Sequence, residues 1–481
     1  MRDLFALAAM ALAALACACQ PREPFSCASS EQCVSGGIRG TCETTGFCSF
    51  DDPACDGGRR YEPNAGDGLG GTCVPAAPTP PGPEVCGAVS QTCCKTGPAC
   101  LSNGRCSGGT CASCVVDVSF GHHAACLVKH DGTVWCAGEN GAGELGFGIA
   151  GTPVPTWTQA RDSTSAVIGD ATAIAAGSEH ACALRAGGTV WCWGSGFGTS
   201  AVQVLKLDDT PLAGIIELRA GAGFRCGRDG NGGIWCWGAG GAGQLGDGTT
   251  TTRGRAAPVL DAVGGPPTTG AVSLSIGSSH SCIRKADDSI WCWGSNGSAR
   301  IGDGTTTNVL LPKKIATGLS VAAGKHHTCT VHLDGTVWCA GESWRNRIGN
   351  GVGTYDMPAP ATYPTPVQVV TTRGGPPLTN ASAVFTGGLS CALVNKAAYC
   401  WGDNLYGQIG TGAGTTTPAP VLTTNGKPLT GVDRMAAFGP HACAFRDDGE
   451  ILCWGRGIDG EFGDGTFNNR GLATSLGFSC Q

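Results

Sequence analysis

Short apolar segments that each contain a cysteine recur in pairs along most of the chain. In the clearest copy, the apolar run 175–184 is followed by a Gly187-Gly188 turn signal and then by a second run, 190–194. Two apolar runs that flank a turn signal predict an antiparallel β-hairpin. Seven copies of this pattern indicate seven copies of one supersecondary unit.

The two cysteines of each copy are ten residues apart in six copies and nine residues apart in one. Cysteines at this spacing can lie directly opposite each other on a hairpin, where Cα atoms are roughly 4.5–5.5 Å apart and a disulfide can form. In the nine-residue copy, a two-residue turn at Asn395-Lys396 keeps the pair opposite. We expect seven hairpin disulfides: Cys126–Cys136, Cys182–Cys192, Cys226–Cys236, Cys282–Cys292, Cys329–Cys339, Cys391–Cys400 and Cys443–Cys453.

The second run of each hairpin is apolar on both faces. Alternation in a strand places Trp191 and Trp193 on one face and Val190 and Cys192 on the other, so both faces need a protein cover. First cysteines 44 to 62 residues apart leave room for about four strands per copy. We therefore predict an all-β fold, a seven-bladed β-propeller over residues 115–481, preceded by small disulfide-rich modules.

Tryptophan packing is expected to join neighbouring blades. Copies two, three and four carry two tryptophans in the second run of the hairpin. Copies one and five carry Ala137 and Ala340 in place of the second tryptophan. We therefore expect less side-chain packing between blades at these two joints.

The repeat resembles a known family. The pattern G-x-x-H-x-C-x-L at 177–184, G-x-V-W-C-W-G at 188–194 and G-x-G-Q-L-G-D-G-T at 241–249 is similar to the regulator of chromosome condensation repeat. The resemblance covers residues 115 to about 479 and implies the propeller fold. It implies no single activity, because the family includes nucleotide-exchange factors, inhibitors of secreted enzymes and binding proteins. Paired cysteines in every blade are typical of a secreted bacterial branch.

The first 19 residues have the pattern of an export signal. A basic residue precedes the apolar run 4–18, which is too short to span a membrane and ends in small residues. The segment 14–17 resembles a bacterial lipoprotein cleavage box, so Cys17 is one candidate for lipidation and Cys19 is another. Cleavage without lipidation stays open. We expect a location in the cell envelope, lipid-anchored to a bacterial membrane, or secretion.

The 30 cysteines of the chain require an oxidising compartment. Two small modules, residues 20–74 and 86–114, flank a proline-rich linker at 75–85, and each of two groups of six cysteines allows 15 disulfide connectivities. The cysteines outside the hairpins and these groups include Cys114 and Cys480. They stand at the two ends of the propeller, which are neighbours in a ring, so we predict a Cys114–Cys480 bond that clasps the first and last blades.

Candidate chemical motifs are explained by the repeat. The glycines of 241–246 match a dinucleotide-binding fingerprint, but no helix follows and 141–146 repeats the pattern, so we interpret it as a structural turn. Asp247, Asp303 and Asp464 each supply one carboxylate to a turn, far short of the roughly six to eight oxygens that calcium requires, and are interpreted as turn caps.

Histidines also follow the repeat. Four of them lie two residues before a hairpin cysteine and are expected to hydrogen-bond internally: His180, His280, His327 and His441. The adjacent pairs 122–123 and 326–327 point to opposite faces of a strand and are expected to be poor chelates. We predict no catalytic, cofactor-binding or metal-binding residues, and no cofactor.

A net charge of −6 with 14% charged residues leaves no basic footprint for nucleic acid. The leading hypothesis is a monomeric, non-enzymatic protein that binds a protein or glycan through one propeller face and contacts the membrane only through its lipid. Equivalent inter-blade segments at 210–212, 264–267, 374–377 and 427–429 are expected on one face. Alternatives are inhibition of a secreted enzyme, guanine-nucleotide exchange on a small GTPase, and a hydrolase built in the central cavity.

Overall fold

A computed structural model describes residues 115–352, 361–412 and 414–476, together with seven short strands of the N-terminal part. The chain divides into two compact units, residues 1–85 and 86–481. The predicted clasp cysteines Cys114 and Cys480, and the lipidation candidates Cys17 and Cys19, lie outside the described residues.

The described strands of the N-terminal part are short and antiparallel. In their backbone register Cys42 lies opposite Cys48, and Cys106 lies opposite Cys111. The strands are β1 Val34–Ser35, β2 Ile38–Arg39, β3 Thr41–Cys42, β4 Cys48–Asp51, β5 Arg59–Tyr61, β6 Cys106–Ser107 and β7 Thr110–Cys111.

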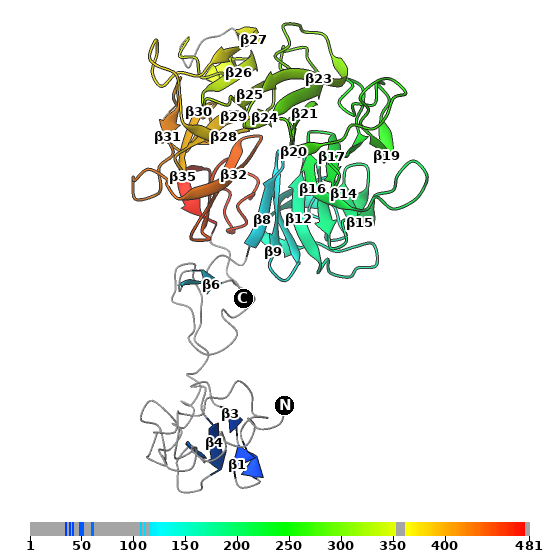
Figure 1. The fold of residues 1–481 in the computed structure, drawn as a ribbon, viewed down its shortest axis with the longest axis vertical. Helices are drawn as coiled ribbons and strands as arrows, with labels where there is room; N and C mark the ends of the chain where they lie inside the picture. Colours follow the sequence, from blue (N-terminus) through cyan, green and yellow to red (C-terminus); the bar gives the residue numbers. More distant parts are fainter. Residues whose placement is uncertain are drawn as a thin grey trace, which may run out of the picture. The chain divides into compact units, whose positions relative to one another are not determined.

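Residues 115–476 form seven four-stranded antiparallel sheets, each made of four consecutive strands, and the predicted seven-bladed propeller is confirmed. Figure 1 shows the first strand of each blade next to the centre of the ring. Blades 1 to 3 consist of β8 Val115–Phe120, β9 Ala124–Lys129, β10 Val134–Asn140 and β11 Gly151–Gln159; β12 Ala171–Ala176, β13 His180–Arg185, β14 Val190–Gly194 and β15 Gly198–Gln203; β16 Ile215–Ala220, β17 Phe224–Asp229, β18 Ile234–Gly238 and β19 Arg253–Pro258.

Blades 4 to 7 repeat this order. They consist of β20 Ala271–Ile276, β21 His280–Lys285, β22 Ser289–Gly294 and β23 Val309–Thr317; β24 Ser320–Ala323, β25 His327–Val331, β26 Val337–Glu342 and β27 Thr362–Gln368; β28 Ala381–Thr386, β29 Leu389–Val394, β30 Ala397–Gly402 and β31 Ala419–Pro420; β32 Val432–Phe438, β33 His441–Arg446, β34 Ile451–Gly455 and β35 Arg470–Ser475. One short 3-10 helix, η2 Trp344–Asn346, follows β26.

Each blade contains a disulfide between its second and third strands. The two cysteines are directly opposite in the register, for example Cys182 and Cys192, whose Cα atoms are 4.0 Å apart. In blade 6, Asn395 and Lys396 have φ values of 52° and 62°, as a two-residue type I′ turn requires, and this turn keeps the shorter pair opposite. All seven hairpin bonds expected from the spacing are present.

Both faces of each blade are covered by neighbouring blades. Trp193 of blade 2 packs with Leu145 of blade 1, whereas Cys192 on the opposite face packs with Leu218 of blade 3. This arrangement satisfies strands that are apolar on both sides.

The loop after the third strand of one blade holds a tryptophan of the next. The indole N–H of Trp193 donates to the carbonyl oxygen of Glu144 at 2.8 Å, and that of Trp293 donates to Gln244 at 3.0 Å. A Cβ on Gly146 would lie 2.7 Å from the indole nitrogen of Trp193, so this position has no room for a side chain. The fingerprint-like glycine segments are therefore structural loops of the blade joints.

The joint into blade 1 is not thin, contrary to the expectation from Ala137. Trp157, on the fourth strand of blade 1, packs with Phe120 and Phe462 and lies against Gly463 of blade 7. The tryptophan that the third strand lacks is replaced by one from the neighbouring strand. At the joint into blade 5, Ala340 does face Gly302 of blade 4.

Polar side chains that line the central channel also join the blades. The innermost strand of a sheet exposes unpaired backbone N–H groups on its open edge. Asp117 and Ser119 of blade 1 accept hydrogen bonds from the N–H groups of Ile174 and Ala176 of blade 2, at 3.1 and 2.9 Å. Glu217, Ser275 and Ser320 make the equivalent contacts to the blades that follow them.

Candidate binding face

The loops that follow the third strand of the blades carry an apolar patch on three neighbouring blades. Five residues after the second hairpin cysteine, blades 5, 6 and 7 have Trp344, Leu405 and Ile458, which are 40%, 59% and 44% exposed. Blades 1, 3 and 4 have glycine at this position. In blade 2 it is Phe197, which the Arg225 guanidinium covers at 4.7 Å. We call Trp344, Leu405 and Ile458, together with Arg345, Asp403, Tyr406 and Arg456, the blade 5–7 patch.

Charged and aromatic side chains link the members of this patch. Arg345 of blade 5 donates to the carboxylate of Asp403 of blade 6 at 2.9 Å, and its guanidinium lies 5.2 Å from the ring centre of Trp344. Tyr406 of blade 6 lies 5.7 Å from the guanidinium of Arg456 in blade 7. These contacts join the loops of blades 5, 6 and 7 that carry the exposed apolar side chains.

Buried arginines in the loops after the third strands hydrogen-bond to the backbone of the next blade. Arg347, 1% exposed, donates from Nε to the carbonyl oxygen of Gly388 in the next blade at 2.7 Å. Arg300 of blade 4 donates to the carbonyl oxygen of Lys325 in blade 5 at 3.0 Å. Burial lowers the pKa of both arginines. These contacts fix the spacing between loops of successive blades.

All four repeated histidines are buried, and the expected internal hydrogen bond is present at His280 and His327, where it bridges blades, whereas both ring nitrogens of His441 make none. His280 Nε2 lies 2.8 Å from Thr328 Oγ1, whose hydroxyl donates to the carbonyl oxygen of Arg300, so the imidazole is the donor. His327 makes the same contact to the hydroxyl of Ser390 at 2.7 Å. Burial lowers the pKa of His180, His280 and His327 well below the usual value, so they are neutral at pH 7.

The predicted turn-capping aspartates occupy that role. Asp247 accepts hydrogen bonds from the N–H and hydroxyl of Thr249 and from Arg253. Although burial opposes ionisation, these hydrogen bonds hold the pKa of Asp247 below its usual range. Asp303 and Asp464 cap Thr305 and Thr466 in the same way.

The equivalent inter-blade segments are structural as well. Leu205 and Pro211, Leu260 and Pro267, Val370 and Pro377, and Leu422 and Pro428 form isolated antiparallel bridges at corresponding places. The leucines that follow, Leu212 and Leu429, are 1% exposed. These segments anchor the fourth strand of a blade to the joint with the next.

The central channel encloses about 300 Å³ and is lined by the first strands of all seven blades. Its described carboxylates are engaged: Asp117 pairs with Arg434 at 3.2 Å, and Glu217 pairs with Arg228 at 2.7 Å and Arg219 at 3.1 Å. A hydrolase in this cavity would need converging catalytic groups, and these carboxylates serve the blade joints.

One group of possible metal ligands was missed by the sequence patterns. His123, Glu139 and Asp459 place ligand atoms within 4.8 Å of one another, the only such trio among the described residues. The expectation that histidines 122 and 123 point to opposite faces of a strand is wrong, because both precede β9 and His122 Nδ1 lies 2.6 Å from His123 Nε2. His123 also faces carboxylates 16 and 336 positions away. In the sequence, His123 lies three residues before the first hairpin cysteine of blade 1 and Glu139 lies three residues after the second. This register is the only sequence signal that could have placed His123 and Glu139 side by side.

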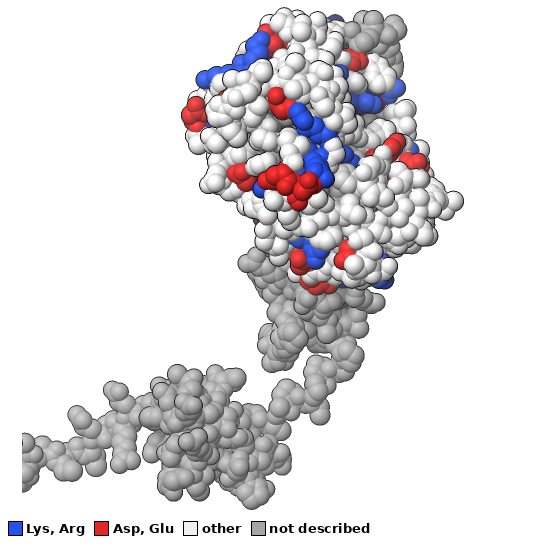
Figure 2. All heavy atoms as spheres, turned by 90° about the vertical axis from the view of Figure 1, so that its right-hand side faces the viewer, with Lys and Arg blue, Asp and Glu red and all other residues white. Residues whose placement is uncertain are grey.

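The surface charges are interspersed. In Figure 2, Lys and Arg side chains lie beside Asp and Glu, and most of the described surface on that side is uncharged. No described helix is long and apolar enough to cross a membrane.

These features define a seven-bladed β-propeller with one disulfide in every blade, joined by tryptophan-holding loops. The chain carries regulator of chromosome condensation (RCC1) repeats, and residues 171–197, 271–299, 231–283 and 287–331 match the repeat profiles. The resemblance inferred from the motifs is therefore confirmed for the repeat and the fold.

Curated relatives include the E3 ubiquitin-protein ligase HERC2 of human and of mouse. Each is 26% identical over 356 residues, which are 73% of this chain and 6% of the relative. Similar solved structures include human WBSCR16, at 17% identity and a TM-score of 0.49 over 75% of this chain and 81% of that one. Yeast RCC1 (Prp20) bound to Kap60 is also 17% identical, with a TM-score of 0.46 over 75% and 74%.

Proposed function

We propose that this protein is a non-enzymatic binding propeller that recognises a protein partner through the blade 5–7 patch. The observation that carries the proposal is the exposure of Trp344, Leu405 and Ile458 at one repeat position where three other blades have glycine. Binding hot spots are enriched in Trp, Tyr and Arg, and this patch combines Trp344, Tyr406 and arginines. An apolar centre with a polar rim is the usual anatomy of such an interface.

We further propose that the propeller acts outside the cytoplasm, attached to a bacterial envelope membrane by a lipid on Cys17 or Cys19. Seven disulfides in the described blades support an oxidising compartment. The apolar run 4–18 supplies an export route. Inhibition of a secreted enzyme is one form that this binding could take.

The binding proposal is tested with the full-length, oxidised protein immobilised against envelope and secreted extracts. The double variant Trp344→Ala, Leu405→Ser removes most of the exposed apolar area of the patch. Val263→Ser, at a side chain that is 77% exposed on another loop, is the matched control. We expect wild type and control to retain the same partner and the patch variant to lose it.

A partner that binds wild type and the patch variant equally well would refute this assignment of the binding surface. Fractionation of cells tests the location separately. A protein found in the envelope with lipid on Cys17 or Cys19 supports the proposal. A reduced, cytosolic protein would refute export and favour guanine-nucleotide exchange instead.

A further inference from the structure

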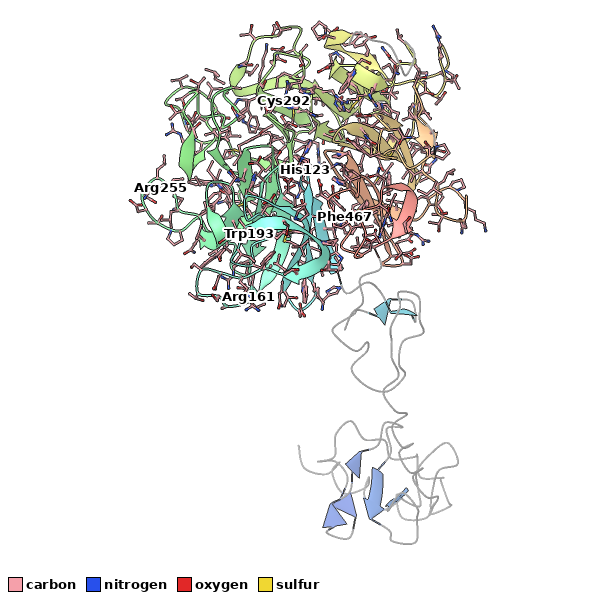
Figure 3. All side chains as sticks on the ribbon, turned by 180° about the vertical axis from the view of Figure 1, so that it is seen from behind. His123, Arg161, Trp193, Arg255, Cys292 and Phe467 are labelled. Atoms are coloured by element: carbon pink, nitrogen blue, oxygen red, sulfur yellow. A yellow bond between two sulfur atoms is a disulfide. The ribbon has the colours of Figure 1, made fainter. Side chains whose placement is uncertain are left out.

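Three potential metal ligands converge where the last blade meets the first. His123 Nδ1 lies 2.8 Å from the carboxylate oxygen Oδ2 of Asp459 and 3.5 Å from Oε2 of Glu139. His123 immediately precedes β9 of blade 1 and Glu139 lies on β10, whereas Asp459 lies in the loop after β34 of blade 7. Their side chains are 32%, 41% and 22% exposed, so an ion from solvent can reach them. Figure 3 shows His123 towards the middle of the ring, away from the rim at Arg255.

The other described blades do not complete this trio. In blade 5, His326 and Glu342 occupy the positions of His123 and Glu139, with His326 Nδ1 3.9 Å from the carboxylate. The residue of blade 4 that corresponds to Asp459 is Ser298, which has no carboxylate. At this loop position the remaining long loops carry Ala142, Ala242, Arg345 and Tyr406.

The local charge favours a cation. Arg456 lies 2.6 Å from Asp459 Oδ2 and 2.6 Å from Oε1 of Glu461. Two carboxylates, Asp459 and Glu461, therefore share one guanidinium, and Glu139 adds a third negative charge beside His123. Arg456 lies equally close to Asp459 and to the buried Glu461, so one positive charge offsets only part of the negative charge of these three carboxylates.

His122 orients the imidazole of His123. His122 Nδ1 lies 2.6 Å from His123 Nε2, so the Nε2–H of His123 can donate to it while Nδ1 faces the two carboxylates. A metal-ligating histidine nearly always has its other ring nitrogen held by such a partner.

We propose that His123, Glu139 and Asp459 bind one divalent transition-metal ion of the zinc type across the seam between blades 1 and 7. One imidazole nitrogen and two carboxylate oxygens form a ligand set that zinc accepts, with water completing a tetrahedron. Bonds of about 2.0–2.2 Å place tetrahedral ligand atoms roughly 3.3 Å apart. The spacings from His123 Nδ1, 2.8 and 3.5 Å, bracket that value, and all three ligand atoms lie within 4.8 Å of one another, so side-chain movements alone would bring them around one ion. Such an ion ties together residues 336 positions apart in the chain.

The test uses zinc chloride titrated into the full-length oxidised protein, with binding measured by calorimetry. Asp459→Asn keeps the size of the side chain, Asp459→Ser copies the blade 4 residue, and His123→Gln removes the nitrogen ligand. His326→Gln in the incomplete blade 5 pair is the matched control. We expect the three site variants to weaken one zinc site at least tenfold and the control to leave it unchanged. Cobalt substitution should give the absorption of a tetrahedral site in wild type and not in Asp459→Asn.

Failure to detect zinc binding at micromolar concentration would overturn the proposal. So would zinc binding that Asp459→Asn and His123→Gln leave unaltered, because the ion would then lie elsewhere. Far-ultraviolet circular dichroism of each variant verifies that it is folded. If His123→Gln does not fold, Asp459→Asn decides the outcome, since its side chain keeps the same shape.

Discussion

Acidification should destabilise the propeller through its buried histidines. His180, His280 and His327 are 2% exposed or less, and burial lowers their pKa well below the usual value of roughly 6.5. The native state therefore holds them neutral, whereas the unfolded chain protonates them as the pH falls below 6.5. Since the unfolded state binds more protons, the free energy of unfolding falls as the pH decreases.

The magnitude follows from the proton difference. Three native histidines that stay neutral cost roughly 4 kcal/mol per pH unit together once the unfolded histidines are fully protonated, or about 5 kcal/mol between pH 6.5 and 5, since the unfolded histidines are only half protonated at pH 6.5. His122 and His326, whose pKa burial lowers to about 4, act in the same direction. Capping aspartates such as Asp247 have a lowered pKa, so their contribution is lost only below about pH 4. The window from pH 6.5 to 5 therefore lies above the range in which these aspartates titrate.

The assay is proton uptake on urea unfolding at pH 5.5 with the disulfides intact, together with the urea midpoint followed by tryptophan fluorescence. His280→Gln, which retains an N–H donor for Thr328, should reduce the uptake by about one proton per molecule. His130→Gln, at an exposed histidine, is the control. A urea midpoint that does not change between pH 7 and 5, or equal uptake by wild type and His280→Gln, would refute the reasoning.

Three further changes test the contacts between blades and the disulfides within them. Gly246→Ala places a Cβ 2.7 Å from the indole nitrogen of Trp293 at a φ of 67°, so we expect the free energy of unfolding to fall by about 2–4 kcal/mol. Gly187→Ala is the control, because its φ is 82° and no neighbour lies within 4 Å, so it measures the backbone strain alone. Equal losses in the two variants would show that the contact with Trp293 is unimportant. Phe462→Ala, at a side chain that is 1% exposed in the seam between blades 7 and 1, should cost about 3–5 kcal/mol in chemical denaturation, and a loss below 1 kcal/mol would contradict this account of ring closure. Replacing Cys391 and Cys400 together by serine opens a ten-residue loop, which should lower the free energy of unfolding by about 3 kcal/mol if the disulfide acts through chain entropy. The urea midpoint is compared with that of wild type under oxidising conditions, and an unchanged midpoint would contradict this expectation.

Most of the architecture was predictable because the information is local and repeated. A cysteine ten residues from its partner across a turn signal determines both the hairpin and its register, as the opposition of Cys182 and Cys192 confirms. The two-residue turn at Asn395 and Lys396 followed from a single missing residue. Apolar residues on both faces of a strand required neighbours on both sides, and the ring of blades supplies them.

The blade 5–7 patch and the proposed ion site were less accessible to sequence reasoning. Trp344, Leu405 and Ile458 stand at one repeat position, yet their exposure became apparent only when the loops were placed. The sequence places His123 next to His122, whereas its carboxylate partner Asp459 comes from the opposite end of the propeller. A pattern within one blade carries no information about the loop that the preceding blade presents to it.

The amino-acid sequence by itself determined the hairpins, their disulfides, the number of blades and the apolar character of both sheet faces, because each depends on residues a few positions apart. Only the tertiary structure decided how the blades meet. Closure of the ring placed Trp157 where Ala137 leaves a gap, and it brought blade 7 loop residues against the hairpin of blade 1. Those contacts depend on the relative placement of whole sheets, which side-chain size and loop length at every joint determine together.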